Sequence, residues 1–272
     1  MHFEFLADTP IAAVALAFVF SLLVGSFLNV VIYRLPLMME REWQLMASQA
    51  QDSATADEEP PPFNLAVPAS RCPHCEHRIR WYENIPLISY LALRGRCSNC
   101  SASIPLRYPV VELLTGLASA LVVWQFGLNE QGLSLMLLSW ALLALTFIDL
   151  DHQLLPDRIT LPLLWLGLIL NSFEVFTSLQ SALWGAVIGY LSFWSIYWVF
   201  KLLTGKEGMG YGDFKLLAAL GAWCGALQLP LIILLSSFVG VILALILMLL
   251  RRHQAANPCP SAPTSPSPAG SP

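Results

Sequence analysis

The sequence predicts an all-α polytopic membrane protein with about seven transmembrane helices, within limits of six to eight, and one small cytosolic loop domain. Of its 272 residues, 56% are hydrophobic and only 12% are charged, about half the charged share of a typical soluble domain. Apolar stretches of the ~20 residues that a helix needs to cross a bilayer recur along the chain. A net charge of -4 without a basic stripe makes the lipid bilayer, and not nucleic acid, the expected surroundings.

The expected spans follow the apolar stretches in order. The first covers residues 11–33 of an initial segment 1–33, and we expect it to be retained, because residues 1–10 carry no Lys or Arg and its 23 residues exceed the apolar core of a cleaved signal peptide. The later spans are expected at residues 109–126, 132–148, 159–176, 181–203, 214–228 and 230–250. Together these later spans form a predicted helix bundle over residues 108–250.

The basic residues predict the orientation of the chain. Lys and Arg collect on the cytosolic side of a membrane, because their translocation is disfavoured. Eight of the 14 basic residues lie from Arg34 to Arg107, and the other six also fall in cytosolic segments if the N-terminus lies outside. The sequence therefore predicts an external N-terminus, a cytosolic C-terminus and a cytosolic loop.

The loop, residues 34–107, is expected to contain a linker and a folded module. Residues 47–69 combine acidic, small and polar residues with three consecutive prolines, a composition that cannot bury a core. Residues 70–107 are the expected ordered part. At the other end of the chain, the proline-rich segment 251–272 is expected to be a disordered tail.

Four cysteines in the loop have the spacing of a zinc site. They form two C-x2-C pairs separated by 21 residues: Cys72, Cys75, Cys97 and Cys100. Four thiolates give Zn²⁺ a closed tetrahedral shell, so we expect a structural zinc-binding module. Two disulfides or a redox pair are the alternatives, and a reducing cytosol disfavours the disulfides. His74 and His77 are possible substitute ligands, although we expect them to be solvated.

Two aspartates are the candidate catalytic residues. Asp149 ends the third predicted span and Asp213 begins the sixth, so both are expected at the cytosolic membrane edge, facing each other. Two carboxylates a few Å apart share a proton and can act as the acid and base of an aspartic protease. Gly208, Gly210 and Gly212 would let a substrate backbone approach. A proton-coupled transporter is the alternative, although its carboxylates normally lie nearer the midplane.

Four other ionisable residues lie at or near the ends of the predicted spans. Asp157 is expected to cap the fourth predicted span. Asp151 is either a solvated loop residue or a support for Asp149. Glu112 is either a charge near a helix N-terminus or a buried polar partner of the site, and Arg34 is expected to be a cytosolic anchor.

The motifs together resemble the type IV prepilin peptidases, which belong to the GxGD class of membrane aspartic proteases. The resemblance covers about residues 10–250. It rests on residues 25–36, the four-cysteine loop, residues 81–86, residues 107–112, the Asp149 segment and residues 210–215.

The resemblance implies substrates, a second activity and a location. The substrates would be type IV prepilins and the pseudopilins of type II secretion, cut by Asp149 and Asp213 at the cytosolic face of the bacterial inner membrane, which makes the N-terminus periplasmic. The same chain would then N-methylate the new N-terminal residue with S-adenosylmethionine. The resemblance alone carries the methylation and its cofactor, and no residue is assigned to hold S-adenosylmethionine.

Overall fold

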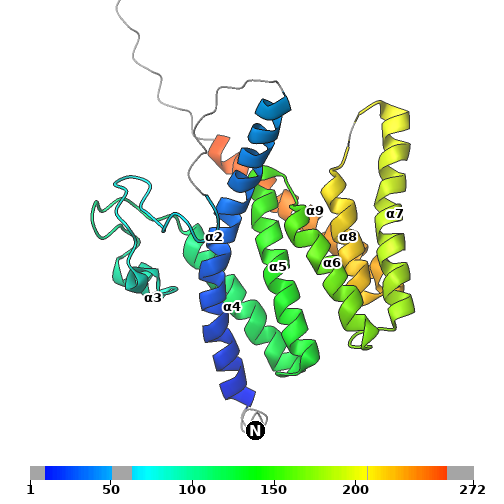
Figure 1. Cartoon of the computed structure of the whole chain (residues 1–272). Helices are drawn as coiled ribbons and strands as arrows, with labels where there is room; N and C mark the ends of the chain where they lie inside the picture. The colour runs from blue at the N-terminus through cyan, green and yellow to red at the C-terminus, as the bar shows by residue number, and fades with distance from the viewer. Residues whose placement is uncertain (1–9, 51–62, 207, 256–272) are drawn as a thin grey trace, which may run out of the picture. The chain divides into compact units, whose positions relative to one another are not determined.

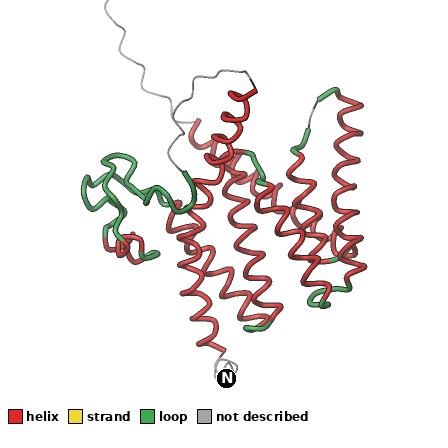
Figure 2. The backbone as a smooth tube through the Cα atoms, in the orientation of Figure 1, coloured by secondary structure: helices red, strands yellow, loops and turns green. Residues whose placement is uncertain are grey.

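The computed structural model describes residues 10–50, 63–206 and 208–255, and helices dominate these ranges (Figures 1 and 2). Within them the only β pairing consists of two isolated bridges in the loop. The chain divides into two compact units. The first, Met1–Leu227, holds the helices up to α8, and the second, Gln228–Pro272, holds α9. The all-α prediction is confirmed.

A long helix lies at each of the seven places where a span is predicted. These helices are α2 (Pro10–Ala50), α4 (Arg107–Phe126), α5 (Glu130–His152), α6 (Asp157–Ser172), α7 (Leu179–Thr204), α8 (Tyr211–Cys224) and α9 (Leu229–Ala255). By length and composition α2, α4, α5 and α7 can each cross a membrane, and α8 with the first part of α9 would count as a fifth, interrupted span. The number of helices thus agrees roughly with the prediction. Fewer of them qualify as spans by themselves, because α6 and α8 have only 16 and 14 residues.

Helix α2 is longer than the predicted first span. It continues through Pro36 to Ala50, because the residues after the apolar stretch include good helix formers such as Leu, Met, Glu and Gln. Residues 47–50 of the predicted linker are therefore helical, and residues 63–69 form loop. Residues 51–62 lie outside the described part of the chain. Of the predicted tail, residues 251–255 end α9 and residues 256–272 lie outside the described part.

Within the first unit, two groups of helices are joined through α5. Helix α2 packs on α4 and α5, and its residues Leu28 and Ile32 form a buried cluster with Val111 and Ile148. Helix α8 packs on α6 and α7. A second cluster, which includes Trp223 of α8, connects α5, α6 and α8. In Figure 1 the C-terminal ends of α5 and α7 and the N-terminal ends of α6 and α8 lie at the same end of these helices.

The loop between α2 and α4 contains two hairpins of the same design. In the first hairpin, Cys72 donates its backbone N–H to the carbonyl of His77 and accepts from the N–H of Glu76. In the second, Cys97 makes the equivalent bonds with Ala102 and Ser101. The short 3-10 helix η1 (Trp81–Asn84) and helix α3 (Ile88–Ala92) connect the two hairpins. Each C-x2-C pair therefore lies on a tight turn that presents both sulfurs together.

Candidate active site and metal centre

The C-terminal end of α5 and the N-terminal end of α8 hold the two candidate catalytic aspartates. Asp149 lies in the last turn of α5, which ends at Gln153 in a left-handed conformation with φ 51°. Asp213 lies in the first turn of α8, where its N–H bonds the carbonyl of Gly210 at 3.3 Å. Because the chain reverses between these helices, both aspartates lie at the same end of the bundle (Figure 1).

The carboxyl groups of Asp149 and Asp213 lie within electrostatic range of each other. Asp149 is exposed, whereas Asp213 is half-buried. A pair of this kind, with one member open to solvent, can pass a proton between a bound substrate and water.

Two of the three glycines before Asp213 pack against neighbouring side chains, whereas the sequence predicted that all three leave room for a substrate backbone. A Cβ atom on Gly212 would lie 2.7 Å from the Cβ atom of Leu155, and one on Gly208 would lie 2.7 Å from the ring of Phe200. Only Gly210 has an open side, where the nearest atom is an Asp213 carboxylate oxygen at 3.7 Å. A substrate backbone therefore has room at Gly210, whereas Gly208 and Gly212 let the start of α8 fit against its neighbours.

Asp151 contributes to an ion pair beside Asp149. The guanidinium of Arg107, the first residue of α4, pairs with the Asp151 carboxylate. The same guanidinium donates to the backbone carbonyl of Phe147 at 3.1 Å. Arg107 therefore holds the last turn of α5 on both sides of Asp149, which favours the supporting role for Asp151 over that of a solvated loop residue.

Asp157 does not cap α6, and that prediction is wrong. Pro156 occupies the N-cap position, and Asp157 is the first residue inside the helix. Its carboxylate instead accepts two bonds from the Lys215 ammonium group, at 2.7 and 2.6 Å. This ion pair ties the first turn of α6 to the first turn of α8, where Asp213 lies.

Two further charged residues are buried and bond backbone groups of the loop. Glu112 is 8% exposed and accepts the N–H of Leu87 at 2.9 Å, so it is a buried polar group that joins α4 to the loop. Arg34 is also 8% exposed and donates to the carbonyl of Asn64 at 3.0 Å. Arg34 therefore makes a buried contact at the base of the loop.

The four predicted metal ligands meet in one cluster. All their sulfurs lie within 4.8 Å of one another, at 3.8 Å between Cys72 and Cys100 and 4.0 Å between Cys75 and Cys97. Zinc–sulfur bonds of about 2.3 Å imply a tetrahedron with edges of about 3.8 Å. All four are free thiols and not disulfides. The donor set therefore fits a tetrahedral metal ion.

The hairpin backbone favours the metal-binding form of two of these cysteines. Hydrogen bonds from the backbone of His77 and the side chain of Asn99 lower the pKa of Cys75 to about 7. Bonds from the backbone of Cys100 and Asn99 likewise lower the pKa of Cys97. The thiolate is the form that binds metal. In the described part of the chain, neither His74 nor His77 joins the cluster.

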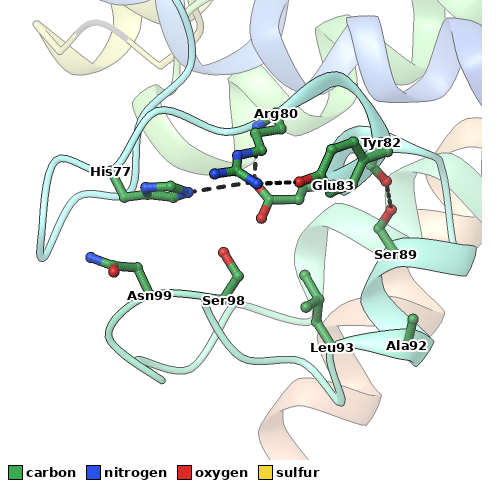
Figure 3. Close-up of a pocket in the computed structure, with 9 residues that line it drawn as sticks. All are labelled: His77, Arg80, Tyr82, Glu83, Ser89, Ala92, Leu93, Ser98 and Asn99. Carbon is green, nitrogen blue, oxygen red and sulfur yellow. Dashed lines mark hydrogen bonds and ion pairs between the residues drawn. The ribbon is translucent and has the colours of Figure 1, made fainter.

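A cavity of about 480 Å³ lies beside this cluster, inside the loop domain. Figure 3 shows Arg80 and Glu83 on one side and Ser98 and Asn99 on the other. Its lining residues are His77, Arg80, Tyr82, Glu83, Ser89, Ala92, Leu93, Ser98 and Asn99. The sequence does not predict this cavity, because its walls come from segments that no spacing rule connects.

Known families and relatives match nearly the whole chain. Residues 19–126 match the bacterial peptidase A24 N-terminal domain, and residues 136–245 match the type IV leader peptidase family. A relative from Stutzerimonas stutzeri is 60% identical over 96% of this chain and 90% of its own length. A relative from Pseudomonas aeruginosa is 56% identical over 96% of this chain and 89% of its own length. A relative from Neisseria gonorrhoeae is 53% identical over 90% of this chain and 86% of its own length. All three carry the name prepilin leader peptidase/N-methyltransferase. No solved structure matches.

Proposed function

The chain belongs to the type IV leader peptidase family, and we infer from this premise that it is an enzyme with two activities, a prepilin leader peptidase and an N-methyltransferase. The family is the one that the sequence motifs predict. It also decides against the proton-coupled transporter, the alternative use of the two aspartates. Pseudopilins of type II secretion are further substrates in this proposal.

We propose that Asp149 and Asp213 are the catalytic pair. The observation that carries this assignment is that the C-terminal end of α5, with Asp149, and the N-terminal end of α8, with Asp213, lie at the same end of the bundle (Figure 1). The ionised carboxylate takes a proton from water while the water oxygen bonds to the scissile carbonyl carbon. The protonated partner donates a hydrogen bond to the carbonyl oxygen. The C–N bond then breaks as the leaving nitrogen takes up a proton.

The test is to replace each aspartate with asparagine. Asp149→Asn and Asp213→Asn remove one ionisable group each without changing the side-chain shape, so leader cleavage should fall by about 10²–10⁴-fold or more. Cleavage is followed by the size shift of a prepilin incubated with the detergent-purified enzyme. Glu130→Gln, at the exposed opposite end of α5, is the matched control and should cleave normally. Normal cleavage by either asparagine variant would refute the pair.

We propose that the aspartate end of the bundle faces the cytosol. Arg107, Arg158 and Lys215 lie in the first turns of α4, α6 and α8, whereas residues 127–131 and 173–178, which connect the opposite ends, contain no Lys or Arg. Positive residues favour the cytosolic side. The N-terminus would then be periplasmic, and the bond to be cut would lie where a prepilin leaves the inner membrane.

We further assign two groups that the enzyme would bind. Cys72, Cys75, Cys97 and Cys100 would hold one zinc ion, and four thiolates leave no open position, so its role is structural. S-adenosylmethionine, when bound, supplies an electrophilic methyl group to the new terminal amine.

A further inference from the structure

Tyr197, two turns before the end of α7, is a buried polar residue among aromatic rings. It is only 2% exposed. The centroid of its ring lies 5.3 Å from that of Tyr211 and 5.7 Å from that of Phe214. A phenylalanine could fill such a position by packing alone, whereas a buried hydroxyl costs free energy unless it is hydrogen-bonded. What the Tyr197 hydroxyl contributes must therefore lie in its hydrogen bonds.

These hydrogen bonds join the end of α7 to the start of α8. The Lys201 ammonium, one turn later on α7, donates to the Tyr197 oxygen at 3.2 Å. The hydroxyl of Tyr211, the first residue of α8, donates to the same oxygen at 3.3 Å. The Lys201 ammonium also lies over the Tyr197 ring, 5.5 Å from its centroid. Lys201 therefore fixes Tyr197 on its own helix, and Tyr197 in turn holds the first residue of the next.

The start of α8 depends on neighbouring residues for its position. Its N-cap residue, Gly210, has no side chain that could cap the helix, and two more glycines lie within two residues of it. Glycine leaves the backbone more freedom than any other residue, so this segment keeps one geometry only if other groups hold it. Tyr197 contacts it on both sides of Asp213, through Tyr211 two residues before and Phe214 one residue after.

We propose that Tyr197 is a positioning residue for leader cleavage, and that its hydrogen bond with Tyr211 holds Asp213 in the catalytic geometry. The inference rests on the role proposed above for Asp213. A displacement of about 1 Å at a catalytic group can cost on the order of 10²-fold in rate. Loss of the hydroxyl pair should therefore appear in kcat. It should change KM little, because neither hydroxyl is assigned to bind the substrate.

The experiment compares Tyr197→Phe, Tyr211→Phe and the double variant by steady-state kinetics of prepilin cleavage, with full-length detergent-purified enzyme. Each change removes one hydroxyl and keeps the ring. Each single variant should lower kcat by about tenfold, within the range for small displacements of a catalytic group, with little change in KM. Because both changes break the same hydrogen bond, the double variant should be no slower than the slower single variant.

Tyr190→Phe is the matched control. It removes a hydroxyl from the same helix, two turns before Tyr197 and outside the hydroxyl pair, and it keeps the contact of its ring with Phe214 at 6.0 Å between centroids. It should keep the wild-type kcat and KM. An equal loss of kcat in this control would show that hydroxyl removal on α7 slows the enzyme without regard to Tyr211, which overturns the inference.

The remaining outcomes separate the inference from the function beneath it. Tyr211 is 52% exposed, so Tyr211→Phe should fold even where Tyr197→Phe does not. A wild-type kcat for Tyr211→Phe overturns the inference, as do rate losses that multiply in the double variant, because the two hydroxyls then act independently. A wild type that leaves prepilin uncut, or an Asp213→Asn enzyme that cleaves normally, refutes instead the proposed function.

Discussion

Each candidate catalytic aspartate is followed, two residues later, by a residue paired with another helix. Asp151 after Asp149 pairs with Arg107 at the start of α4. Lys215 after Asp213 pairs with Asp157 at the start of α6. Such exposed pairs add little stability by themselves. Their value lies in holding the two helix ends in register, so we interpret these four residues as positioning residues.

We predict that Arg107→Ala lowers kcat for leader cleavage by about 10–100-fold with little change in KM, because small displacements of a catalytic group cost about that much. The substitution removes both the Asp151 pair and the bond to the Phe147 carbonyl. Arg107→Lys should restore part of the rate, since it can keep the ion pair. Steady-state kinetics with a prepilin measure both parameters.

Arg94→Ala removes an exposed arginine of the loop and is the control for this series. It should leave both parameters unchanged. An Arg107→Ala enzyme with a wild-type kcat would show that the last turn of α5 needs no support from α4.

At the scale of elements, helices α7 and α8 approach each other through glycines. A Cβ atom on Gly185 would lie 2.2 Å from the carbonyl oxygen of Gly221, and one on Gly221 would lie 2.2 Å from the carbonyl oxygen of Gly185. Small residues at such a crossing let helix backbones pack closely in a membrane. The position of α8, and with it that of Asp213, depends on this contact.

We predict that Gly221→Ala destabilises the protein by about 1–3 kcal/mol, the usual cost of overpacking a core, and lowers leader cleavage. The added methyl group meets rigid backbone, so the two helices must move apart. Thermal unfolding in detergent, followed by circular dichroism, measures the change. Gly240→Ala is the matched control, because that helical glycine has no neighbour within 4 Å of an added Cβ. A Gly221→Ala protein as stable as this control would contradict the close contact.

At the scale of the whole molecule, the loop has little core of its own. Between residues 63 and 106 the buried residues are Cys72, Pro86, Ser89 and Gly95. Small domains of this kind gain their folding free energy from a bound metal. The helices α2 and α4–α8 have their own buried clusters, so we expect the two parts to differ in their response to metal loss.

We predict that the purified protein contains about one zinc ion per chain, as expected for a four-thiolate site. Strong chelation, or the double change Cys72→Ser with Cys97→Ser, should make the loop sensitive to proteases while most of the helical circular dichroism signal remains. Elemental analysis and limited proteolysis measure the two effects. Cys224→Ser, outside the cluster, should keep the metal. A reduced, intact sample without metal would refute the zinc assignment.

The sequence by itself determined the places of the long helices, the four-cysteine array and the two aspartates. Each of these depends on a local pattern: a stretch of apolar residues, a spacing of two residues within a hairpin, or a charged residue at the end of an apolar stretch. Helix ends were less predictable, as α2 shows, because good helix formers continue a helix beyond its apolar part. The prediction that Asp157 caps α6 was wrong, because Pro156 is the N-cap residue and the Asp157 carboxylate pairs with Lys215.

Only the tertiary structure decided which charged groups pair and where a cavity forms. Lys215 and Asp157 are 58 residues apart, and Arg158 and Glu42 are 116 residues apart. No local pattern connects such partners, because they meet only after helices from distant parts of the chain have packed. The loop cavity likewise exists only once the two hairpins have folded around the cysteine cluster. Short sequence motifs therefore specify the chemical groups of the site, whereas the positions of these groups relative to one another depend on the packing of the whole first unit.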